Sequence, residues 1–307
     1  FNHPDPNGRQ MQVLSKMIRD LRDGRYKTET DPYHVLLYKD NTITSPEEWK
    51  ELLTNAYIWY DWFSQPQPSQ GTTQDEIATL KQDLVLALDS VSAYVERADT
   101  LVILAPSSVH TDLVDTKTGR KTYTCYRTWR RRGWCLLELY AAVMARDSSN
   151  PPLLVRSEKG TPMWMSPLEV MKLSIGLADF TCCQRGHVIT TETQKVMNGG
   201  EVKKIPCDKP IAGGILEQLI DAKINHLFNA EGDMVMARLH CVFKHWWMRG
   251  LKEEEKLVSD DEESAIEMFK KKLRWNEDKE WFDCDGMGLL MYAVTADEMH
   301  VVSELLR

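Results

Sequence analysis

Short apolar runs alternate with amphipathic segments in the first part of the chain, and this alternation limits the fold more than any other feature. The longest amphipathic segment, residues 73–98, repeats apolar side chains three or four positions apart, as in a helix that covers one face of a sheet. We expect strands at residues 35–38, 57–60, 100–105, 152–155 and 178–183. Parallel strands need helical crossovers, so the order predicts an α/β fold with a doubly wound, parallel, five-stranded, flavodoxin-like sheet.

The pattern changes after the fifth predicted strand. Runs of strand length stop there, and a polar stretch that returns through residues 202–205 precedes further amphipathic helices. We therefore expect an N-terminal helix (residues 1–30), an α/β domain (31–185), a hairpin with an α-rich extension (186–250), an acidic linker with one helix (251–280) and a last helical unit (281–307).

Charge and cysteine content exclude several classes of protein. The formal net charge is -8 and the two signs are interspersed, so no extended basic field is available for nucleic acid. The seven cysteines are irregularly spaced, unlike a secreted disulfide framework, which favours a reducing, intracellular and cytoplasmic location. No apolar run approaches the roughly 20 residues of a spanning helix, so we expect no membrane span.

Polar side chains follow the ends of three predicted strands. Asp40 follows the first strand, Asp61, Trp62 and Ser64 the second, and Ser107 the third. Open α/β sheets bind ligands at the carboxyl ends of their strands. The sequence therefore predicts a ligand crevice lined by these side chains.

Residues 128–140 predict a helix with one acid at the edge of its apolar stripe. Trp134 and Leu137 lie on the stripe, and Glu138 lies on its flank. One interpretation of Glu138 is therefore a helix-flank acid paired with a neighbouring arginine. Arg130 is the first of three consecutive arginines, which either bind a phosphate or lie partly in solvent and partly at an interface.

The order of these features resembles a TIR domain, in which a late helix opens with the pattern Trp134-Cys135-x-x-Glu138-Leu139. Residues 57–67 and 129–138 also resemble the heterokaryon-incompatibility (HET) domain, which is itself TIR-like. The resemblance implies that Glu138 is the catalytic residue of NAD cleavage, with Asp61, Ser64 and Ser107 placing NAD as the substrate. A carboxylate suits this reaction because loss of nicotinamide creates an oxocarbenium-like ribose.

Two positions after the second predicted strand are candidates for contacts with NAD. Trp62 is the candidate to stack on the nucleobase, and Asp61 either positions a ribose hydroxyl or caps the turn before Ser64. The connection at residues 109–127 is longer than the one usual in TIR domains. It either completes the ligand cleft or fills it.

The end of the chain resembles one ankyrin repeat. The resemblance rests on Asp283, Gly286, Leu290, Ala293 and the pairs at 301–302 and 305–306, with Asp297 in place of the mid-repeat glycine. One repeat cannot bury its own face, so the resemblance implies further repeats beyond Arg307 and protein partners. The sequence also begins without a methionine and therefore reads as a piece of a longer chain, so targeting signals could lie outside it.

Soft metal ligands gather near the end of the α/β pattern. Cys182, His187 and Cys207 are the candidates, brought together by a returning hairpin. Adjacent residues on a strand point to opposite faces, so we expect only one of Cys182 and Cys183 to serve. These three residues are weak candidates for a zinc site, and we expect no metal and no required cofactor.

Taken together, these features predict an intracellular signalling or scaffold module. Its α/β domain self-associates or docks, and its repeats recruit protein partners. The first alternative is an NAD(P) glycohydrolase, a hydrolase with Glu138 as its acid. The second is a structural subunit whose ligand cleft has degenerated.

Overall fold

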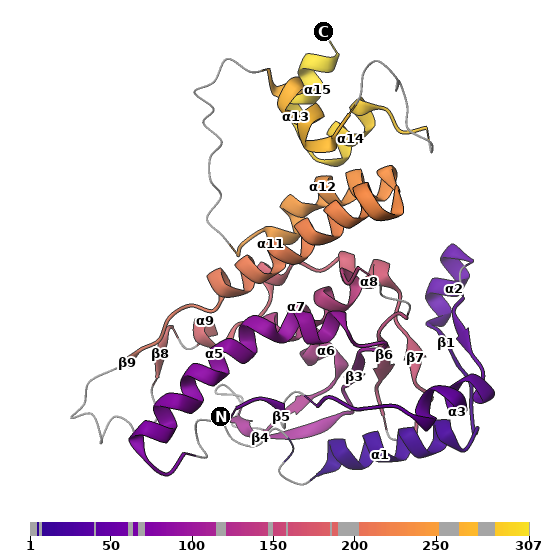
Figure 1. Cartoon of the computed structure of the whole chain (residues 1–307), viewed down its shortest axis with the longest axis vertical. Coiled ribbons are helices and arrows are strands. Elements are labelled where there is room, and N and C mark those ends of the chain that lie inside the picture. The colour runs from indigo at the N-terminus through magenta and orange to yellow at the C-terminus, as the bar shows by residue number, and fades with distance from the viewer. Residues whose placement is uncertain are drawn as a thin grey trace. The chain divides into compact units, whose positions relative to one another are not determined.

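The computed structural model describes residues 5, 8–39, 41–60, 64–66, 71–114, 121–146, 150–157, 159–184, 186–189, 203–251, 264–275 and 286–306 (Figure 1). The chain forms two compact units. Unit 1 comprises Phe1–Val143 and Asp147–Lys172, and unit 2 comprises Met144–Arg146 and Leu173–Arg307. Residues 173–185 of the expected α/β domain therefore belong to unit 2.

A mixed five-stranded sheet forms the centre of unit 1. Its order is β2 (Ile43–Thr44), β1 (Thr28–Thr30), β7 (Met163–Trp164), β6 (Leu153–Val155) and β3 (Val102–Leu104). The β1–β7 and β3–β6 pairs are parallel, whereas β1–β2 and β6–β7 are antiparallel. A separate antiparallel hairpin joins β4 (Ser108–Val114) to β5 (Lys121–Thr124).

Seven helices of unit 1 are described: α1 (Arg9–Arg22), α2 (Pro32–Tyr38), α3 (Pro46–Thr54), α5 (Gln74–Glu96), α6 (Tyr126–Trp129), α7 (Gly133–Val143) and α8 (Pro167–Met171). Capping boxes begin α3 and α5, among others. Ser45 and Glu48 exchange hydrogen bonds at the start of α3, and Thr73 and Glu76 do so at the start of α5.

Two stacked tryptophans hold the sheet of unit 1 against its helices. The rings of Trp49 on α3 and Trp164 on β7 lie 5.5 Å apart between centroids. Both indole N–H groups donate to buried hydroxyls, Trp49 to Thr28 at 3.0 Å and Trp164 to Thr44 at 3.1 Å. The apolar face of α1 joins the same core. Burial of these large rings, with their polar atoms satisfied, fixes α3 on the short strands.

Unit 2 begins with short elements: η2 (Ile175–Leu177), α9 (Thr181–Gln184) and the antiparallel strands β8 (Val188–Ile189) and β9 (Lys203–Lys204). Longer helices follow: α11 (Lys209–His226), the π-helical η3 (Leu227–Glu231), α12 (Met234–Met248), α13 (Ala265–Leu273), α14 (Leu289–Thr295) and α15 (Met299–Leu305). Helix α12 packs on α11, α13 and α14, and α15 packs on α13 and α14. No helix among the residues described is long and apolar enough to cross a membrane.

The expected α/β class with a five-stranded sheet is confirmed, but three predicted strands are wrong. Residues 35–38 lie in α2, because Asp31 caps Tyr33 and Pro32 occupies the first helical turn. Residues 57–60 form no strand, and Tyr57 is 99% exposed. Residues 181–184 form α9 instead of ending a strand. We expected a fully parallel sheet. The observed sheet is mixed, because its other three strands are β1, β2 and β7 and not the three runs predicted from the sequence.

Candidate functional site

The residues expected around a ligand crevice are only partly described. Asp40, Asp61 and Trp62 lie outside the described residues. Ser64 and Ser107 are exposed, and Glu138 is half-buried on α7. The catalytic role of Glu138 therefore stays a prediction from the sequence.

An open depression of about 500 Å³ lies beside α6 in unit 1. It is lined by Tyr126, Arg127, Arg130 and Arg131, and not by Glu138. The guanidinium groups of Arg130 and Arg156 lie 6.0 and 5.2 Å from the centroid of the Tyr126 ring. Arg130 thus lies in a basic, partly aromatic surface, without the carboxylate that the NAD scheme requires among its lining residues.

Cys125 immediately precedes α6 in unit 1. The backbone N–H of Thr128 points at the thiol and holds the pKa of Cys125 below its usual range. In unit 2, burial raises the pKa of the Cys241 thiol.

These opposite shifts predict an order of alkylation. A lowered pKa increases the thiolate fraction at neutral pH, and the thiolate is the nucleophile. Cys125 is therefore expected to react with iodoacetamide well before Cys241, as measured by peptide mass spectrometry after timed pulses on the folded protein. Equal rates for the two thiols would contradict the described environments.

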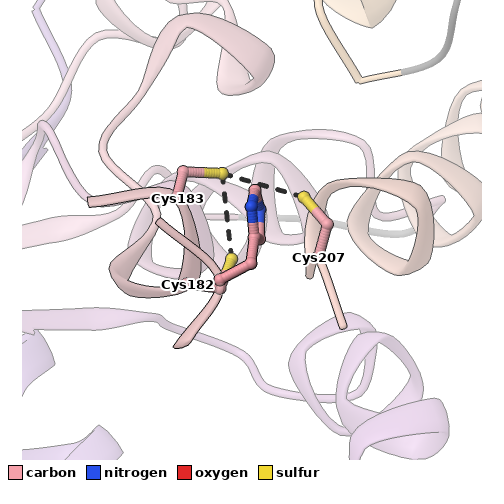
Figure 2. Close-up of side chains that lie close together, drawn as sticks. Cys182, Cys183 and Cys207 are labelled. Carbon is pink, nitrogen blue, oxygen red and sulfur yellow. Dashed lines mark hydrogen bonds between the residues drawn. The ribbon is translucent and has the colours of Figure 1, made fainter. Parts of the chain in front are cut away.

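Four metal-binding side chains meet at one point in unit 2. Cys182 and Cys183 come from α9, His187 from the turn before β8, and Cys207 from the segment between β9 and α11. Their ligand atoms all lie within 4.8 Å of one another. The Sγ atom of Cys183 lies 3.8 Å from that of Cys182 and 3.7 Å from that of Cys207 (Figure 2).

A tight turn and a short hairpin bring these residues together. The amides of Gly186 and His187 donate to the carbonyls of Cys183 and Cys182 at 3.0 and 2.8 Å. Gly186 and His187 both have left-handed backbones, with φ of 60° and 58°, which glycine adopts without strain. The amide of Ile205 donates to the carbonyl of His187 at 2.9 Å, beside the β8–β9 pair. This pairing returns the chain so that Cys207 faces α9.

The surroundings of the cluster suit negatively charged sulfur. The amide of Asp208 donates to Cys182 Sγ at 3.3 Å. The backbone N–H of Lys209, at the start of α11, lowers the pKa of the Cys207 thiol. Burial, followed by hydrogen bonds to the Cys207 and Cys182 thiols, raises the pKa of Cys183 to about 11. The Nε2 atom of His187 is buried and has no hydrogen bond of ordinary geometry in the described part of the chain.

Sequence reasoning grouped Cys182, His187 and Cys207 and expected only one of Cys182 and Cys183 to serve, whereas the structure brings all four side chains together. The sequence interpretation placed the cysteine pair on a strand, where neighbouring side chains diverge by about half a turn. On a helix, successive side chains diverge by only about 100°, so both sulfurs reach the same point. The signal in the sequence was the spacing of Cys182, Cys183 and His187 before a segment that returns to Cys207.

The comparisons with known proteins add no family to these observations. No protein-family model, curated protein or solved structure matches the chain. Its function must therefore be argued from its own residues.

Proposed function

We propose that the chain is a protein-interaction module whose C-terminal helices form part of a repeat array and dock a helical partner. The observation that carries the proposal is the stacking of consecutive helices in unit 2. Helices α12 and α13 contact each other, α14 and α15 contact each other, and each helix of the first pair contacts one helix of the second. Repeat arrays are built in this way, because each helix pair buries its apolar face on its neighbour.

The local geometry of the last helix pair supports the ankyrin-like interpretation. Asp297 has a left-handed backbone with φ of 59°, the conformation that the mid-repeat glycine otherwise supplies. Its neighbour Glu298 closes the end of α14 by donating to the carbonyl of Ala293 at 3.0 Å. Tyr292, Ala293, Val301 and Val302 are buried. The two helices thus have a buried side within unit 2 and a sharp turn between them.

The apolar side chains of α14 that remain exposed indicate the kind of partner. Met291 and Val294 lie one turn apart on this helix and are 49% and 60% exposed. Because the neighbouring pair in the array is itself a helix pair, the occupant that fits this surface is a further helix pair of the same kind, presented by a partner protein. Flexible methionine and branched aliphatic side chains suit such helix packing.

Unit 1 is the second part of the proposed interaction module. Helix α7 carries the Trp134-Cys135-x-x-Glu138-Leu139 pattern with Cys135, Leu136, Leu137 and Leu139 buried, which is compatible with a TIR- or HET-like domain. Self-association of this unit stays a prediction from the sequence.

A site-specific cross-linking experiment tests the docking surface. A photoreactive benzoylphenylalanine at position 294 is expected to cross-link a helical-repeat protein in cells, whereas the same group at Gln218, an exposed polar position on α11, is not. The substitution Met291→Glu should abolish the cross-link at 294, because it puts a charge into the apolar contact. Equal labelling at 294 and 218, or labelling unaffected by Met291→Glu, would contradict the proposal.

A further inference from the structure

We propose that Cys182, Cys183, His187 and Cys207 bind one zinc ion as a closed, tetrahedral Cys₃His site that holds the start of unit 2 together. This inference is independent of the proposed function, because it rests on a different part of the chain. It goes beyond the sequence-based expectation, which counted only three donors.

The separations between the sulfurs match the geometry of a zinc site. A tetrahedral ion with Zn–S bonds of about 2.3 Å places two sulfurs about 3.8 Å apart. The Cys182–Cys183 and Cys183–Cys207 separations are 3.8 and 3.7 Å. A disulfide would instead require sulfurs about 2.05 Å apart. Both separations match those around a shared tetrahedral ion, and dashed lines in Figure 2 join the Cys183 sulfur to the sulfurs of Cys182 and Cys207.

The fourth donor also fits. His187 Nε2 is buried without a hydrogen bond of ordinary geometry, and the only described group with which the His187 side chain interacts electrostatically is the Cys207 thiol of the same cluster. All four donor atoms lie within 4.8 Å of one another, a range that one ion spans. An iron–sulfur cluster would distribute its protein ligands over several irons and needs a wider site. The set of donors therefore fits a mononuclear ion.

The donor types favour zinc over the other common ions. Thiolate and imidazole are soft or intermediate ligands that Zn²⁺ binds in tetrahedral geometry, whereas Mg²⁺ and Ca²⁺ select oxygen. Binding releases the protons of the three thiols and leaves the centre with one net negative charge. The amide of Asp208, which donates to Cys182 Sγ at 3.3 Å, stabilises that charge.

The arrangement assigns the ion a structural role. Four protein donors fill the tetrahedron and leave no position for water or substrate, as in structural zinc sites. The donors come from α9, the turn at Gly186, and the segment before α11, so the ion links elements that otherwise meet through two short strands. Two residue pairs of β-structure are marginal by themselves. We therefore expect the zinc ion to stabilise this hairpin.

The first test measures metal in the full chain, purified under reducing conditions from cells supplied with zinc. One zinc per folded chain is expected after dialysis. Replacement by Co²⁺ should give the intense visible bands of a tetrahedral site and a sulfur-to-cobalt charge-transfer band. Chelation should accelerate hydrogen exchange at the Ile205 amide, which bonds to His187. Folded protein without stoichiometric metal, or with a Cys183–Cys207 disulfide in a non-reducing peptide map, would overturn the proposal.

The second test separates ligand loss from misfolding. His187→Asn keeps all three cysteines and suits the left-handed backbone at this position, where φ is 58°, but its side chain is too short to reach the ion. Competition with a chromophoric chelator should show a loss of zinc affinity greater than the roughly 10–100-fold that follows loss of a ligand's hydrogen-bond partner. The control Cys125→Ser, outside the cluster, should bind zinc as the wild type does. Unchanged affinity in folded His187→Asn protein would overturn the four-ligand site.

Discussion

Trp164→Ala is expected to destabilise unit 1 by about 3–5 kcal/mol, the usual cost of removing a buried large aromatic ring. Trp164 is among the largest fully buried side chains described. It stacks on Trp49 and donates to Thr44, so the substitution removes packing on α3 and a buried hydrogen bond together. Peptide-level hydrogen exchange in urea measures the effect on unit 1 separately from unit 2.

A conservative variant separates the loss of ring packing from the loss of the buried hydrogen bond. Trp164→Phe keeps a ring against Trp49 but removes the donor to the Thr44 hydroxyl, so we expect a loss of about 1–3 kcal/mol. A Trp164→Ala variant no less stable than Trp164→Phe would contradict the described core.

Arg238→Met is expected to loosen α13 from α12 by about 3 kcal/mol, because it removes two hydrogen bonds from a buried cation. The Arg238 side chain is fully buried on α12. Its Nε and Nη2 atoms donate to the carbonyls of Leu273 and Arg274 at 3.1 and 3.4 Å. These carbonyls end α13, where the helix dipole favours a cation. The guanidinium carbon also lies 4.4 Å from the centroid of the Trp275 ring.

Native-state hydrogen exchange of the α13 amides is the measurement for Arg238. Arg238→Lys should lie between the wild type and Arg238→Met, because an ammonium keeps the charge but loses the planar fork that reaches two carbonyls. An equal effect of both substitutions would show that charge alone matters there. Unchanged protection of α13 in Arg238→Met would contradict the contact itself.

Helices were predicted from this sequence better than strands, for physical reasons. The helix expected at residues 73–98 is α5, because helical periodicity is a local signal. Strands depend on partners far along the chain. The run at residues 57–60 is apolar but has no strand pairing, whereas β2 and β7, of two residues each, are too short to leave a pattern.

The candidate metal site was predicted in part. The returning hairpin was expected from the polar stretch, and Cys182, His187 and Cys207 meet as proposed. Cys183 joins the cluster because residues 181–184 form a helix and not the predicted strand, and the angle between adjacent side chains differs between the two. The left-handed conformation of His187 could not be predicted from its residue type, because most residues avoid it.

X-ray absorption at the zinc edge tests the central claim, the Cys₃His centre, most directly. The account predicts three sulfur neighbours at about 2.3 Å and one nitrogen at about 2.0–2.1 Å, with no bound water. His187→Asn should lose the imidazole contribution to the spectrum and leave the sulfur shell. A spectrum with only oxygen and nitrogen neighbours, or no zinc in the folded chain, would contradict the account.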